Sequence, residues 1–105
     1  MPSATTVLQR DVVVASATVP VRLDDPATNA APAGRYWVRV VNPNTTLRVY
    51  IGHSSTVGTH LMNVTNCETV DPNNGVWEDS VGAAVPIYAL TEGGTSITVR
   101  VKQYA

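Results

Sequence analysis

The stretch that decides the fold class is Ile97-Thr98-Val99-Arg100-Val101-Lys102, in which apolar side chains alternate without a break with polar or charged ones. Successive side chains of a β-strand point to opposite faces, so this period of two predicts an antiparallel strand with one buried side. Just before it lies Glu92-Gly93-Gly94, and a Gly-Gly pair permits the positive φ values of a tight hairpin turn. We therefore predict a hairpin between residues 85–91 and 95–104.

A second alternating pair lies upstream, in residues 36–41 and 47–51. The linker Asn42-Pro43-Asn44-Thr45 suits a type I turn, because proline fixes φ at its second position. In the resulting hairpin one face is wholly apolar and is predicted to belong to the core. That face consists of Tyr36, Val38, Val40, Leu47, Val49 and Ile51.

The opposite face of this predicted hairpin places Arg39 across from Arg48, and Trp37 across from Tyr50. Like charges that face each other in a ladder are unfavourable. Arginine and large aromatic side chains are also enriched at the centres of protein interfaces. Two interpretations stay open. The face is a patch that contacts a partner, or an aspartate from Asp24-Asp25 folds back to neutralise the arginines while the aromatics pack under a loop.

The overall composition supports an all-β fold. Eighteen valines and thirteen threonines stand against five leucines and no phenylalanine, and branching at Cβ favours strands over helices. Seven prolines spread along the 105 residues interrupt every long helical window. Several short strands separated by turns are typical of a compact antiparallel β-sandwich or a jelly-roll-like barrel. We predict one such domain over residues 19–105, preceded by an extended N-terminal arm or edge strand over residues 1–18.

The middle of the chain, residues 52–84, is the least regular part. Asp71-Pro72-Asn73-Asn74-Gly75 predicts a turn. A calcium loop is the weaker interpretation of this run, because Gly82 stands where the bidentate glutamate of such a loop is needed. A single helical turn is predicted at Trp77-Glu78-Asp79-Ser80.

Charge and apolar content exclude several classes of partner. Seven Lys and Arg residues against eight Asp and Glu residues give a net charge of −1, which creates no strong field for nucleic acid or an anionic membrane. The most apolar stretch, Val12-Val13-Val14, is far too short to span a bilayer. These three valines are instead predicted to contribute to a protein interface, in which the arm of residues 1–18 adds a strand to an adjacent subunit or threads along it.

Residues capable of catalysis or metal binding are sparse, and none forms a recognised pattern. His53 and His60 lie seven residues apart, without the spacing of a metal pair, so a zinc site with Cys67 is disfavoured. Ser54 or Ser55 beside His53 lacks the glycine pattern of a nucleophile elbow. We therefore predict no enzyme activity, no cofactor and no metal.

Four segments together resemble the two-hairpin pattern of small structural proteins of tailed bacteriophages. They are residues 34–42 (GRYWVRVVN), 47–52 (LRVYIG), 87–90 (IYAL) and 93–101 (GGTSITVRV). The pattern carries no catalytic residue, and this chain departs from it in the long connection 59–84. The resemblance implies a virion component, above all a decoration (cement) protein on the capsid surface, made in the host cytoplasm.

The partners that this resemblance implies are the major capsid protein, further copies of the chain in an oligomer such as a trimer, or both. The predicted interface comprises Trp37, Arg39, Arg48, Tyr50, Val12, Val13 and Val14. A phage tail or fibre-associated module is an alternative within the same class. A carbohydrate-binding β-sandwich module is the alternative from another class, and it would expose Trp37, Trp77 or Tyr50 as an aromatic platform.

Overall fold

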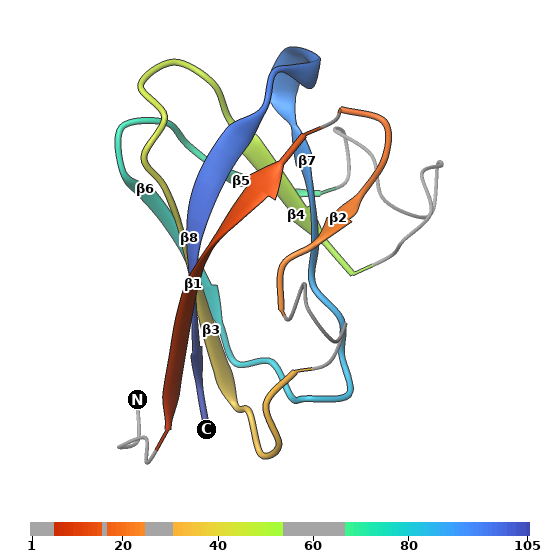
Figure 1. The fold of residues 1–105 in the computed structure, drawn as a ribbon, viewed down its shortest axis with the longest axis vertical. Helices are drawn as coiled ribbons and strands as arrows, with labels where there is room; N and C mark the ends of the chain where they lie inside the picture. Colours follow the sequence, from red (N-terminus) through yellow and green to blue (C-terminus); the bar gives the residue numbers. More distant parts are fainter. Residues whose placement is uncertain (1–5, 16, 25–30, 54–66) are drawn as a thin grey trace.

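The chain forms two four-stranded antiparallel sheets in the computed structural model, which describes residues 6–15, 17–24, 31–53 and 67–105 (Figure 1). Sheet A has the strand order β1 (Val7–Val14), β8 (Ile97–Tyr104), β3 (Trp37–Asn42) and β6 (Gly75–Asp79). Sheet B has the order β2 (Val21–Arg22), β7 (Tyr88–Thr91), β4 (Val49–Gly52) and β5 (Glu68–Val70). Apart from a 3₁₀ turn, η1 (Glu92–Gly94), these ranges contain no helix, so the all-β prediction is confirmed. No helix within them has the length and apolarity needed to cross a membrane.

The core lies between the inner faces of the two sheets. Because inner and outer positions alternate along a strand, every second residue of β3 and β8 is buried. Sheet A supplies Val12, Val14, Val38, Val40, Trp77, Ile97, Val99 and Val101, and sheet B supplies Val49, Ile51, Val70 and Ala89. The core positions predicted for Val38, Val40, Val49 and Ile51 are confirmed, since each is at most 2% exposed.

The pairing of these strands differs from the prediction, because β3 and β4 lie in different sheets and do not form a hairpin. β3 pairs with β6 and β8, whereas β4 pairs with β5 and β7. The buried Asn42 side chain organises the crossing, since its amide donates to the carbonyls of Leu47 at 2.8 Å and Val70 at 3.1 Å. Its side-chain oxygen accepts from the Asn44 backbone N–H at 3.1 Å. The Asn-Pro-Asn-Thr segment therefore bridges the sheets instead of closing a turn.

The predicted C-terminal hairpin is wrong for the same reason. β7 belongs to sheet B and β8 to sheet A, so Glu92-Gly93-Gly94 carries the chain from one sheet to the other. Gly93 has a positive φ of 70°, as the glycine pair suggested. Alternation specifies which side chains face the core, but two facing sheets satisfy that requirement as well as two neighbouring strands do.

The turn predicted at residues 71–75 is confirmed. Asn73 and Asn74 have φ values of 62° and 64°, in the left-handed region that asparagine tolerates. Their backbone N–H groups donate to the carbonyls of Asn44 at 2.7 Å and Asn42 at 2.9 Å, which ties this turn to the crossing between β3 and β4. The helical turn predicted at residues 77–80 is wrong, because residues 77–79 continue β6 as partners of β3.

Gly75→Ala is expected to destabilise the protein by about 1–3 kcal/mol. A Cβ at Gly75 would collide with the backbone carbonyl group of Asp71, so the turn would have to move. Gly82→Ala is the matched control, because a Cβ there meets no atom of the described residues within 4 Å and should leave stability within about 1 kcal/mol of wild type. Equal free energies of unfolding for the two variants in urea would contradict the turn geometry.

The N-terminal segment contributes an edge strand to sheet A. β1 pairs with β8 from Val7 opposite Tyr104 to Val14 opposite Ile97. Val12 and Val14 are buried in the core, while Val13 is 56% exposed. Of the three valines predicted for an interface, only Val13 therefore presents its side chain on the surface. Residues 1–5 of the predicted arm lie outside the described residues.

Candidate interaction face

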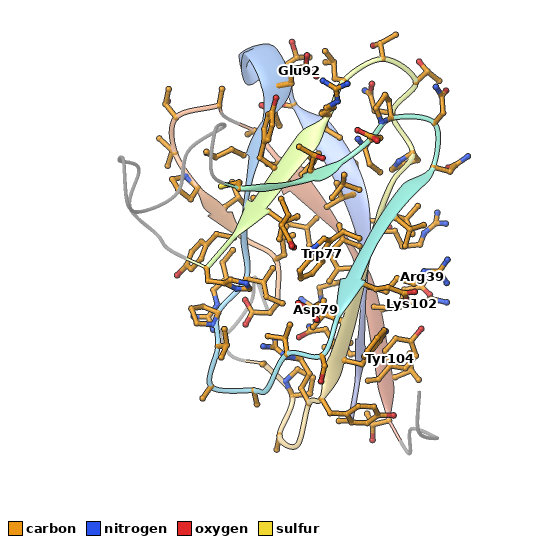
Figure 2. The ribbon with its side chains drawn as sticks, turned by 180° about the vertical axis from the view of Figure 1, so that it is seen from behind. Arg39, Trp77, Asp79, Glu92, Lys102 and Tyr104 are labelled. Carbon is orange, nitrogen blue, oxygen red and sulfur yellow. The ribbon has the colours of Figure 1, made fainter. Side chains whose placement is uncertain are left out.

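The outer side of sheet A carries charged and aromatic side chains in rows that follow the strand register. The row nearest the chain ends joins Val7, Tyr104 and Trp37, the next joins Gln9, Lys102, Arg39 and Glu78, and the third joins Asp11, Arg100, Val41 and Val76. Figure 2 shows Arg39, Lys102 and Tyr104 extending from this side of the molecule. We call these eleven residues the sheet A face.

A hollow of about 250 Å³ lies on the sheet A face. Its lining residues are Arg39, Val41, Asn74, Val76, Arg100 and Lys102. Two valines give it an apolar part, and three of the other four lining side chains are cationic. We call this hollow the sheet A groove.

The charges on the sheet A face are only weakly neutralised. Arg39 lies directly opposite Lys102, an arrangement that is unfavourable by itself. Glu78 Oε2 is 4.0 Å from Arg39 Nε, and Asp11 Oδ1 is 3.8 Å from Arg100 Nε. The four side chains of these two pairs are 42–63% exposed, so each pair contributes about 0–1 kcal/mol to stability.

Arg48 and Tyr50 lie away from this face. Arg48 precedes β4 and Tyr50 lies within it, so both belong to the sheet B side of the molecule. Arg48 Nε donates to Asp71 Oδ1 at 3.1 Å, and this hydrogen bond raises the pKa of the guanidinium. The predicted four-residue patch is therefore split between the two sheets, with only Trp37 and Arg39 on the sheet A face.

Lys102 and Tyr104 are neighbours of Trp37 and Arg39 that the sequence reasoning missed. Both are outward positions of the same alternating strand that decided the fold class. The missing information was that β8 pairs with β3, which places Tyr104 opposite Trp37 and Lys102 opposite Arg39.

A second cluster of polar residues is buried inside the molecule. Asp24, Arg35 and Gln103 are each at most 3% exposed, and we call them the buried polar cluster. Arg35 Nη1 donates to Asp24 Oδ2 at 3.2 Å and to Gln103 Oε1 at 2.9 Å. The other guanidinium nitrogens donate to three backbone carbonyls, at 3.2 Å to Val81, 2.7 Å to Gly82 and 2.5 Å to Val85. The cluster joins the two sheets to the connection between β6 and β7, which is a structural role.

The ionisation of the buried polar cluster follows from its contacts. Arg22 Nε and Nη2 donate to the Asp24 carboxylate at 2.7 and 3.0 Å. Burial alone would raise the pKa of Asp24, but hydrogen bonds, above all those from Arg22, more than offset it and hold this pKa below its ordinary value. Burial lowers the pKa of Arg35, and the charge of Asp24 opposes that shift. Asp24 is therefore an ionised carboxylate shared by two guanidinium groups.

Acid is expected to destabilise the fold through Asp24. Because its pKa is lowered in the folded state, ionised Asp24 stabilises the fold above its unfolded pKa, and this contribution is lost as the pH falls through the folded pKa. Urea midpoints measured between about pH 7 and about pH 2 should fall at the acid end. Asp24→Asn should begin from a lower midpoint and show a flatter pH profile. Parallel profiles for the two proteins would contradict this assignment.

The remaining candidates for chemistry lie only partly within the described residues. His53 Nδ1 lies 2.8 Å from the carbonyl oxygen of Pro86, and Cys67 is half-buried. His60, Ser54 and Ser55 fall on residues that the structure does not describe, as does Asp25. In the part of the chain that the structure does describe, no three His, Cys, Asp or Glu side chains are grouped so that they could hold a metal ion.

Comparison with known proteins identifies no relative of this chain. No protein-family model, curated protein or solved structure matches the chain. The features that bear on function are therefore the order of the strands and the chemistry of the sheet A face.

Proposed function

We propose that this chain is a non-enzymatic structural protein of a tailed-bacteriophage particle, which binds the capsid surface as a decoration (cement) protein and stabilises contacts between capsid subunits. Its partners in this proposal are the major capsid protein and neighbouring copies of itself, contacted through the sheet A face. The observation that carries the proposal is the strand order of the two sheets.

The strand order supports a jelly-roll β-sandwich. Strands of the first half of the chain pair with strands of the second half: β1 with β8, β2 with β7, β3 with β6 and β4 with β5. A long hairpin gives this nesting when it is rolled into two facing sheets, and we infer a jelly roll from it. Jelly rolls recur in viral capsid and lectin domains. Because one fold serves many functions, the surface chemistry is needed to distinguish a capsid role from a lectin-like role.

The sheet A face has the residue types of a protein interface. Trp37, Arg39 and Tyr104 lie in adjacent rows, and these three types of residue are enriched where interfaces gain most of their binding energy. Val7 and Val13 on the same side of β1 are 52% and 56% exposed, which adds apolar surface at the edge of the sheet. Aromatic, cationic and apolar groups on one sheet favour a protein partner.

Trp37→Ala is expected to weaken binding to undecorated particles by about 30-fold, because a central interface tryptophan contributes about 2 kcal/mol or more. Tyr50→Ala is the matched control, since Tyr50 is a half-buried aromatic residue on a strand of sheet B and should not affect binding. Cosedimentation of each purified variant with particles that lack the chain measures the effect. Equal binding by the two variants would contradict the use of the sheet A face.

A carbohydrate-binding module is the second candidate, favoured by the position of Tyr104 directly opposite Trp37 on the outer side of sheet A. Two adjacent aromatic rings on one strand pair suit stacking against a sugar ring. Trp77 is 8% exposed and its indole donates to Glu68, so it cannot serve as the platform. A glycan array without binding would exclude this candidate, and glycan binding lost in Trp37→Ala would favour it over the capsid protein.

A further inference from the structure

The sheet A groove holds more positive charge than the carboxylates of the described residues neutralise. Among the described carboxylates, none forms an ion pair with Lys102. Arg39 Nε is a shielded atom in a side chain that is 42% exposed, and among the described residues it has no hydrogen-bond acceptor, since the 4.0 Å to Glu78 Oε2 exceeds hydrogen-bond distance. That carboxylate oxygen instead accepts from Trp37 Nε1 at 3.3 Å. An anion in the groove would relieve the repulsion between the cations that line it, Arg39 and Lys102 above all.

The surroundings of the groove favour a single anionic group over a polyanion. Asp11 and Glu78 lie on either side of the three cations, on the edge strands β1 and β6. Their carboxylates repel a ligand charged along its whole length, such as nucleic acid or a sulfated glycan. The volume of about 250 Å³ is below the roughly 300–1,000 Å³ of small-molecule pockets, so it suits one or two side chains. Val41 and Val76 can contact an apolar side chain that lies next to the anionic group.

We propose that the sheet A groove binds an acidic side chain, next to an apolar one, from an extended segment of the partner protein. Arg39 and Arg100 donate to the carboxylate, Lys102 supplies a third positive charge, and the two valines contact the apolar neighbour. The identity of the partner, a capsid subunit, rests on the proposed function. The preference for a carboxylate rests on the groove itself.

A titration of the purified full chain followed by NMR tests the proposal. The probe is a capped peptide with one Glu between Val residues (Val-Glu-Val), and the control peptide has Gln in place of that Glu. We expect saturable shifts at the methyl groups of Val41 and Val76 and at the Nε–H of Arg39. Charge-assisted hydrogen bonds are roughly twice as strong as neutral ones, so the Gln peptide should bind at least about tenfold more weakly.

Two substitutions test the charges of the groove. Lys102→Met should weaken binding of the Glu peptide several-fold, whereas Arg48→Met, which removes an exposed arginine on the sheet B side, should not. Equal binding of the Glu and Gln peptides, no saturable shifts at millimolar peptide, or tighter binding of heparin oligosaccharide or single-stranded DNA than of the Glu peptide would each overturn the proposal.

The same variants on particles separate this inference from the proposed function. If wild-type protein binds the Glu peptide but not undecorated particles, the proposed capsid function is wrong and the proposed binding of an acidic side chain in the sheet A groove stands. If particles bind wild type and Lys102→Met equally and neither protein binds the peptide, the proposed binding in the sheet A groove is wrong. The proposed capsid function then stands.

Discussion

Arg35→Met is expected to lower the free energy of unfolding by about 3–5 kcal/mol, out of the roughly 5–15 kcal/mol that stabilises a typical domain. The substitution removes five hydrogen bonds, two of them to Asp24 and Gln103 and three to backbone carbonyls. It also leaves the Asp24 carboxylate, which is 0% exposed, with Arg22 as its remaining described cation. Methionine fills much of the vacated space, so the loss comes mainly from unpaired polar groups. Urea denaturation near neutral pH measures it.

Two further variants show whether the loss belongs to the buried polar cluster. Arg100→Met removes an exposed ion pair of 3.8 Å with Asp11 and should change stability by less than about 1 kcal/mol. Arg35→Lys keeps the charge but lacks the planar fork that contacts several carbonyls at once, so it should recover only part of the loss. If Arg35→Met is no more destabilising than Arg100→Met, the cluster does not hold the two sheets together.

Removal of residues 1–14 is expected to abolish cooperative folding. The deletion takes away β1, whose eight residues pair with β8, and two valines of the core. Val12 and Val14 together contribute about 3–6 kcal/mol, at about 1.5–3 kcal/mol for each fully buried side chain. The loss of the strand also exposes the edge of β8 and the inner face that β1 covered. Circular dichroism and thermal unfolding measure the outcome.

Removal of residues 1–5 is the control, because it leaves β1 intact and should change stability little. A protein that lacks residues 1–14 and still unfolds cooperatively near the wild-type midpoint would show that β1 is dispensable to the domain. The N-terminal segment would then be available as an arm for a neighbouring subunit. Particle binding by the shorter deletion tests separately whether the first residues contact such a neighbour.

The sequence predicts well which side chains face the core and poorly which strands pair. The alternation at residues 36–41, 47–51 and 97–102 depends only on the geometry of a single strand. Its predicted inward positions are buried, except that Tyr36 and Leu47 are only half-buried. Pairing depends on the segments between strands. Asn42 lies in a run that reads as a hairpin turn, yet its buried amide binds carbonyls on both sides of a crossing between sheets. Nothing in the local pattern distinguishes these two outcomes.

The candidate site was predictable only in part, because alternation gives the outward positions of a strand but not the strands that pair with it. The outward positions of Trp37 and Arg39 follow from alternation, but the predicted pairing of Arg39 with Arg48 is wrong, because Lys102 lies opposite Arg39. The proposal that an aspartate neutralises an arginine has a counterpart inside the molecule, where Asp24 pairs with Arg35. The burial of Arg35 could not be predicted, because its partners are 11 to 68 residues away in the chain.

The claim that the chain is carried on the capsid surface is tested most directly by its copy number in purified virus particles. Quantitative mass spectrometry of gradient-purified particles, with heads and tails separated, gives the ratio of this chain to the major capsid protein. We expect the chain on the heads, in a fixed ratio to the capsid subunits. Its absence from purified particles, or its presence on tails alone, would contradict the proposed function.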